Sequence, residues 1–327
     1  MQEKMQPMDK SQPPLFPDQI RQGLSALDRF ILRLAGKPQN SFFFVLLLIF
    51  FVNGFRSSET DYFHLAQSPF EPYWGAAYVQ DSIFLPLSAY YLGLNQSQIQ
   101  FDIYTVCAFI LALVVIYIFG YRRFRPELPL FLGLTLAASP VSLVAFAWPG
   151  MPDAFTVLFS VITVFSNSIP VLFLAALLGV SNHPQFMFIA IAIGILRLVA
   201  REKDFKVLHA VALTLGTITG FGLVQAFLSY HQIHIEPSRI QLMFAEELSF
   251  WFGSKIIEAP LGLFSLYRGL WFVLPVCLLY GFSRNKPYYI VFLVLQFAAA
   301  GLTLFVLDTT RIFRSEEHTS ELQSPNT

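Results

Sequence analysis

The sequence predicts an all-α membrane protein that crosses the bilayer many times. Of its 327 residues, 55% are hydrophobic and 16% aromatic, whereas only 13% are charged. That charged share is about half the value of about 25% in an average soluble domain. A soluble fold could not hide so much apolar surface, so the composition excludes a cytosolic enzyme, a disordered chain and a small disulfide-stapled domain. The apolar residues also gather in runs of the length that crosses lipid.

The predicted elements follow one another without a repeat or a second folded unit. Residues 1–17 are polar and proline-rich and are expected to be disordered. Over 18–37, apolar residues from Ile20 to Leu34 recur at spacings of four and three, which predicts an amphipathic helix in the membrane interface. A single transmembrane domain over 38–313 then holds about nine predicted spans, at 41–55, 101–119, 128–147, 154–165, 169–180, 186–200, 207–229, 260–281 and 288–307.

Two parts of the chain depart from this pattern of spans. Segment 82–94 is apolar but short and contains Pro86, which predicts a half-buried or re-entrant helix. Residues 314–324 resemble the translation of a sequencing adapter. We therefore expect 314–327 to be a non-native tail, and the natural domain to be truncated here at its C-terminal side, continuing beyond Phe313.

Lysine and arginine predict the orientation, because cytoplasmic segments of membrane proteins are rich in both. With a cytoplasmic N-terminus, fourteen basic residues fall inside and four outside. This assignment needs two short helices over 154–180 that turn at 166–168, since one long helix would move 201–206 to the outer side. The inner residues are Lys4, Lys10, Arg21, Arg29, Arg33, Lys37, Arg122, Arg123, Arg125, Arg201, Lys203, Lys206, Arg284 and Lys286, and the outer ones are Arg56, Arg239, Lys255 and Arg311.

Acidic residues gather in the predicted outer loops, and two of them stand beside spans. Asp61 follows the first span closely, and Asp153 opens a helix that enters lipid. A carboxylate at that depth is shielded from bulk water on one side, so its basicity can be tuned for proton transfer. Asp153 also suits a second role, as the N-cap of its own helix.

Short motifs on the predicted outer side follow a fixed order over residues 41–200. They are Glu59-Thr-Asp61-Tyr62 after the first span, Phe84-Leu-Pro-Leu87 and Tyr91-Leu-Gly-Leu94 before the second, Met151-Pro-Asp-Ala154 opening a later helix, and 175–185, a leucine-rich helix end with His183 in its polar turn. This order resembles the GT-C class of integral-membrane glycosyltransferases, in particular its protein-mannosyltransferase-like members. The chain differs from that class at Asp102, near which an arginine often lies.

The resemblance implies that a hexosyl or pentosyl group moves from a polyprenyl phosphate to an acceptor hydroxyl at the extracytoplasmic face. It implies Asp61 as the general base and Asp153 as the second acid of the catalytic site. The phosphate that leaves in this reaction is negatively charged, so it needs cations or N–H donors around it. The substrate-binding candidates are Glu59, His64, His183, Arg268 and Arg311.

Two interpretations from other classes stay open: a transporter or flippase for a lipid-linked sugar, and a non-catalytic structural membrane protein. Transporters hold ionisable residues near the bilayer midplane, where Arg268 is the clearest candidate in this sequence. Arg268 is equally compatible with a structural role. For His64 a plain interfacial position is the favoured interpretation, and orienting Asp61 or binding substrate is the alternative. Arg197, near the inner end of its span, is expected to snorkel toward the headgroups.

The partners and cofactors expected follow from the same observations. The six histidines do not cluster at metal-ligand spacing, so no metal ligand is assigned, and a divalent cation stays open as a cofactor. No basic patch interleaved with aromatics predicts nucleic acid. The expected partners are a lipid-linked sugar donor, membrane lipids and an acceptor glycan, lipid or protein. The expected location is the cell envelope, as a multi-pass protein of a bacterial plasma membrane with a cytoplasmic N-terminus.

Overall fold

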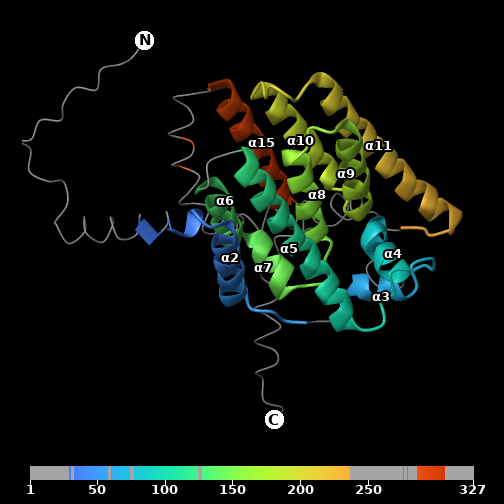
Figure 1. Cartoon of the computed structure of the whole chain (residues 1–327). Coiled ribbons are helices and arrows are strands. Elements are labelled where there is room, and N and C mark those ends of the chain that lie inside the picture. The colour runs from blue at the N-terminus through green and yellow to red at the C-terminus, as the bar shows by residue number, and fades with distance from the viewer. Residues whose placement is uncertain are drawn as a thin grey trace, which may run out of the picture.

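A computed structural model describes residues 29–30, 33–57, 60–73, 77–123, 127–235, 275, 278 and 286–305. Every regular element in this part of the chain is a helix, which confirms the predicted all-α class (Figure 1). The elements are α2 (Pro38–Asn53), α3 (Asp61–Gln67), the 3-10 helix η1 (Ala77–Asp81), α4 (Phe84–Tyr91), α5 (Gln98–Arg123), α6 (Glu127–Ala137), α7 (Pro140–Ala147), α8 (Asp153–Phe165), α9 (Ile169–Asn182), α10 (Phe186–Val199), α11 (Val207–Tyr230) and α15 (Lys286–Phe305).

Two helices, α5 and α11, are long and apolar enough to cross a membrane, and α6 with α7 makes a third if the pair is one broken span. The apolar helices α2, α8, α9 and α10 have only 13 to 16 residues, whereas a perpendicular span needs about 20. By length, the described residues therefore support two or three spans, and the predicted number of nine is not confirmed.

The span predicted over 128–147 is not one straight helix, because α6 and α7 meet at an angle of 63°. The break lies at Pro140, the first residue of α7. Proline has no N–H with which to continue the helical ladder. Instead, the backbone N–H and the hydroxyl of Ser139 both donate to the carbonyl oxygen of Leu136, at 3.0 and 2.7 Å.

The α8–α9 hairpin confirms the two short helices expected over 154–180. Asn182 at the end of α9 donates to the carbonyl of Pro152 before α8, so the two helices are antiparallel. Arg197 of α10 holds the opposite end, because its guanidinium donates to the carbonyls of Thr163 and Ser166. Arg197 is only 3% exposed, so the expectation that it snorkels is wrong.

The remaining predicted elements are placed in part. Segment 82–94 contains the short helix α4, which packs on α3 and α9 and buries Leu85, Pro86 and Ala89. Helix α15 corresponds to the span predicted over 288–307. Of the interfacial helix over 18–37, residues 29–30 and 33–35 are helical, and of the span over 260–281 only 275 and 278 are described. The termini 1–17 and 314–327 lie outside the described residues.

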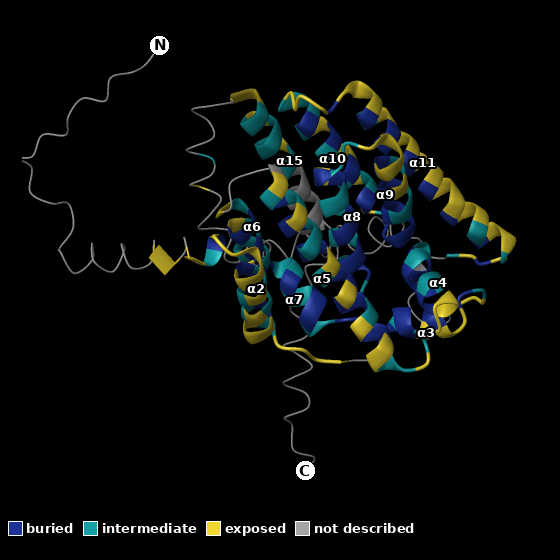
Figure 2. Ribbon diagram, viewed as in Figure 1, coloured by how far each residue is buried: buried dark blue, intermediate teal, exposed yellow. Residues whose placement is uncertain are grey.

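The bundle has two chemically different ends. The site end holds the end of α2, the start of α5, the turn 148–152 and the end of α9, with α3 and α4 beside them (Figure 1). At the basic end, Tyr121 near the end of α5 hydrogen-bonds Ser41 near the start of α2. Exposed apolar residues cover the outer surfaces of α2 and α11 (Figure 2). The basic side chains at the basic end are Lys37, Arg122, Arg197, Arg201, Lys203, Lys206 and Lys286.

Candidate functional site at one end of the bundle

Four of the seven predicted site residues are described, and all four lie at the site end. They are Asp61 and His64 on α3, Asp153 at the start of α8 and His183 at the end of α9. Glu59, Arg268 and Arg311 lie outside the described residues. The chain thus brings residues from three distant segments to one end of the bundle.

Asp61 is the first residue of α3 and is held by a tyrosine from the following loop. The preceding residue, Thr60, is the N-cap, and its side chain accepts a hydrogen bond from the backbone N–H of Phe63. The Tyr73 hydroxyl donates to Asp61 Oδ1 at 2.6 Å. Burial first, and then the hydrogen bond to the Asp61 carboxylate and its charge, raise the pKa of Tyr73 to about 12. Tyr73 is therefore a permanent donor at neutral pH, which orients the Asp61 carboxylate.

His64 and Asp153 differ in detail from what the sequence predicts. The His64 side chain is exposed, and its ring packs against Phe63 with the centroids 5.8 Å apart. Asp153 is the first residue inside α8, and Pro152 takes the N-cap position without a side-chain cap. The N-cap interpretation of Asp153 is therefore wrong, and its carboxylate remains near the positive end of the helix dipole.

The end of α9 is fastened to the start of α8 by Asn182, a residue that sequence reasoning missed. The Asn182 amide is fully buried and donates to Pro152 O at 2.8 Å and to Thr156 Oγ1 at 3.1 Å. His183 follows directly and is only 7% exposed. The backbone N–H of Gln185 donates to His183 Nδ1 at 3.3 Å. A neutral His183 ring therefore carries its proton on Nε2, which makes that atom a donor.

Asp102 is the second residue at this end that sequence reasoning did not assign, and it is 0% exposed. Its Oδ2 accepts a hydrogen bond from the Ser57 hydroxyl at 2.5 Å, and its Oδ1 accepts one from Gln98 Nε2 at 2.6 Å. Ser57 belongs to the segment that leads to Asp61. The only sequence signal was a carboxylate at the start of a span, four residues after a glutamine and three before Thr105.

Gly150 is the point where the three segments of the site meet. Its φ of +88° favours glycine, and a Cβ there would lie 3.0 Å from both Asp102 Oδ1 and Thr60 Oγ1. Its backbone N–H donates to Thr105 Oγ1 at 2.9 Å. Asp61 directly follows Thr60, and Asp153 follows Gly150 by three residues. The turn that precedes Asp153 therefore contacts Thr60, the residue before Asp61.

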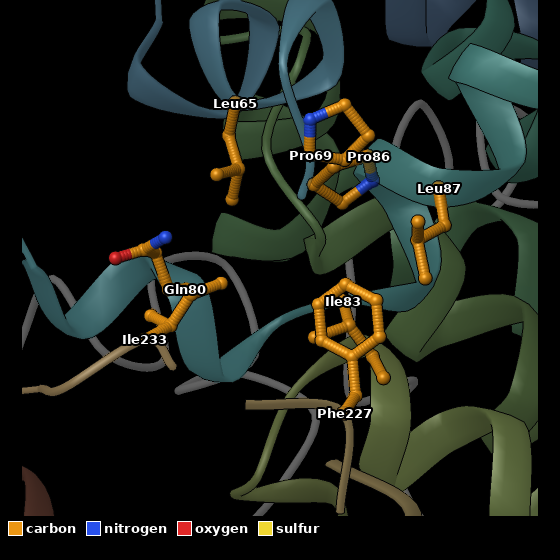
Figure 3. A pocket seen from close by; sticks show the side chains of 8 residues that line it. All are labelled: Leu65, Pro69, Gln80, Ile83, Pro86, Leu87, Phe227 and Ile233. Atoms are coloured by element: carbon orange, nitrogen blue, oxygen red, sulfur yellow. The ribbon is translucent and has the colours of Figure 1, made fainter. Parts of the chain in front are cut away.

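A small apolar pocket lies beside this cluster, between α3, α4 and the end of α11 (Figure 3). Leu65, Pro86 and Phe227 contribute apolar walls, and Gln80 contributes the one amide. None of the predicted site residues lines this pocket. That Asp61 and Asp153 belong to one catalytic site therefore stays a prediction.

No group of three or more histidine, cysteine or acidic side chains among the described residues has the geometry to hold a metal ion. The site end thus offers carboxylates, amides, hydroxyls and an imidazole, which suit proton transfer and the binding of polar groups. No protein-family model, curated protein or solved structure matches this chain.

Proposed function

We propose that the chain is an integral-membrane glycosyltransferase of the GT-C type, which moves a hexosyl or pentosyl group from a polyprenyl phosphate to an acceptor at the extracytoplasmic face. One observation carries this proposal. The segments of Asp61 and Asp153, remote in sequence, lie at the same end of an apolar helical bundle and meet through Thr60, Asp102 and Gly150. Chemistry at one membrane face needs its polar groups gathered in that way.

In the proposed reaction, the acceptor oxygen forms a bond to the anomeric carbon while the bond from that carbon to the phosphate oxygen breaks. The acceptor proton passes to Asp61, and the lipid phosphate leaves with the electron pair. The Tyr73 hydrogen bond occupies Oδ1 of Asp61, so Oδ2 is the oxygen that takes the proton. Asp153 is the second acid, and it positions the acceptor.

The leaving phosphate is anionic and needs donors or cations. Nε2–H of His183 supplies one donor on this proposal, with Arg311 and Arg268 as the cations and with Glu59 and His64 binding other polar groups of the substrates. Most of the described lysines and arginines lie at the basic end, with Arg56 at the site end, which supports a cytoplasmic basic end and an outer site end. The shorter helices α2, α8, α9 and α10 are then also spans, in a locally thinned bilayer. Together with α5, α11, the α6–α7 pair, α15 and the span predicted over 260–281, they make the nine expected.

The test is the substitution Asp61→Asn. Membranes from cells expressing the chain are incubated with a panel of short polyprenyl phosphates that carry radiolabelled hexoses or pentoses. Transfer is measured as the label that leaves the fraction extracted by organic solvent, which holds the lipid donor, and appears in the material that the solvent does not extract. Removing a general base costs about 10²–10⁴-fold in rate, so Asp61→Asn should reduce transfer by at least about 100-fold.

The matched control is Glu71→Gln, which makes the same change at an exposed acid of the same loop and should leave transfer unchanged. Protein amount and protease protection show that both variants insert. Transfer that survives in Asp61→Asn contradicts the proposed base. Movement of intact labelled lipid across the vesicle membrane without sugar transfer would instead support the flippase interpretation.

A further inference from the structure

Asp102 is a buried carboxylate that the proposed reaction does not use. It is 0% exposed, so a substrate of sugar size does not reach it in this conformation. Its side chain accepts hydrogen bonds from Ser57 and Gln98, which are both neutral donors. Burying a polar or charged group is costly unless hydrogen bonds compensate for the lost water. A carboxylate retained in such a position therefore calls for a role beyond packing.

The geometry around Asp102 connects it to two arms of the proposed site, which are the Thr60–Asp61 segment and the turn 148–152 that leads to Asp153. Through Ser57 it holds the segment that leads from α2 into α3, where Asp61 begins the helix. Its Oδ1 faces the same side of Gly150 as Thr60 Oγ1, since both lie 3.0 Å from the Cβ position of that glycine. Its backbone carbonyl accepts from Thr105, whose oxygen in turn accepts the Gly150 N–H.

We propose that Asp102 is the positioning residue of the site, which holds the Thr60–Asp61 segment against the turn that leads to Asp153. The kinetic consequence of this inference rests on the proposed function. The contact between the Thr60–Asp61 segment and the turn before Asp153 does not depend on that function. The relevant property of Asp102 is its shape and its two acceptor oxygens. A misplacement of about 1 Å at a reacting group can cost about 100-fold in rate, so loosening this contact should reduce catalysis more than donor binding.

The kinetic test compares Asp102→Ala with Asp102→Asn in proteoliposomes, using the labelled polyprenyl-phosphate sugar that gives transfer with the unmodified chain. Asparagine keeps the shape, accepts from Gln98 through its oxygen, and can donate to the Ser57 oxygen through its nitrogen. We therefore expect Asp102→Ala to lower kcat by about 100-fold with an unchanged KM for the donor, and Asp102→Asn to keep most of the rate. Ser57→Ala, which leaves the buried carboxylate in place, should give a smaller loss of kcat in the same direction.

A structural readout is measured in parallel and needs no activity. Spin labels at the exposed positions Gln67 on α3 and Gln185 after α9 report the separation of the two arms, on a background with Cys107→Ser and Cys277→Ser. The distance distribution should broaden in Asp102→Ala and stay narrow in Asp102→Asn.

Each outcome decides the inference. If Asp102→Asn loses as much rate as Asp102→Ala, the carboxylate itself takes part in chemistry, and the positioning role is overturned. If Asp102→Ala keeps both kcat and the narrow distribution, the role is equally overturned. If no donor in the panel gives transfer with the unmodified chain, the proposed function fails, and the distance distributions alone then decide whether Asp102 holds the two arms together.

Discussion

Packing between α9 and α11 depends on glycines, and a single added methyl group should separate these two helices. At Gly220, a Cβ would lie 2.6 Å from the carbonyl oxygen of Leu177 and 3.1 Å from its Cα. Ordinary van der Waals contact begins at 3.4 Å, so the methyl is about 0.8 Å too close to a backbone atom. A backbone carbonyl in the middle of α9 has no rotamer by which to move away, so the helices themselves must part.

The magnitude follows from two opposing contributions. Replacing glycine by alanine inside a helix stabilises it by about 1 kcal/mol. Overpacking costs about 1–3 kcal/mol, with rigid neighbours at the upper end of that range. Gly220→Ala should therefore lower the free energy of unfolding by about 2 kcal/mol, which corresponds to about 3–4 °C in Tm for a domain of about 280 residues.

Gly222→Ala is the matched control, because it lies on the same helix with no heavy atom within 4 Å of its Cβ position. Only the helix-propensity gain applies there, so Tm should rise by about 2 °C. Thermal unfolding of both variants is followed by far-UV circular dichroism in one detergent. The packing argument is refuted if the two variants shift Tm in the same direction, or if Gly220→Ala has the same Tm as the unmodified chain.

Two further predictions concern a cation and a phenol. Arg197→Lys and Arg197→Ala should each lower Tm. The Arg197 guanidinium caps the end of α8, pairs with Glu202 at 2.9 Å and stacks 4.1 Å from the Phe205 ring, and the single ammonium of a lysine cannot make these contacts together. An unchanged Tm in Arg197→Lys would contradict this prediction. Tyr73 should ionise near pH 12, above its usual pKa of 10.0. Because folding raises this pKa, its contribution to stability is present in full below pH 10 and is lost as the pH rises through 12. In a pH titration followed by tyrosinate absorbance, Tyr73→Phe should therefore show one fewer tyrosine ionising near pH 12 than the unmodified chain. If the missing tyrosine ionises near pH 10 instead, the pair with Asp61 is refuted.

The sequence predicted the apolar helices well because their signal is local. The runs of α5, α10 and α11 differ from their predicted bounds by a few residues, and the turn at 166–168 followed from counting charges rather than from hydropathy. The bend at Pro140 also had a local signal, a proline inside an apolar run, but hydropathy counts that run as one span. In such cases the composition of a segment determines its structure almost alone.

The site was less accessible to sequence reasoning because its contacts join remote segments. Asp61 and Asp153 became candidates through their motifs, whereas the role proposed for Asp102 depends on Ser57, 45 residues earlier, and on Gly150 in another turn. Asn182 is similar, since its amide recognises the Pro152 carbonyl 30 residues away. No periodicity or spacing encodes such pairs. The carboxylate of Asp102 even counted against the family resemblance, although it connects the residues that carry it.

The Arg197 cluster at the basic end and the site end satisfy their buried polar groups differently. At the basic end, Arg197 directs its donors to Thr163, Ser166, Asn167 and Glu202. At the site end, four amides donate through their NH₂ groups while their side-chain oxygens are buried without a donor among the described residues: Asn53, Asn95, Gln98 and Asn182. A buried acceptor without a donor is costly, and such groups in native proteins call for an explanation. The four unsatisfied oxygens therefore distinguish the site end from the Arg197 cluster, whose donors have acceptors.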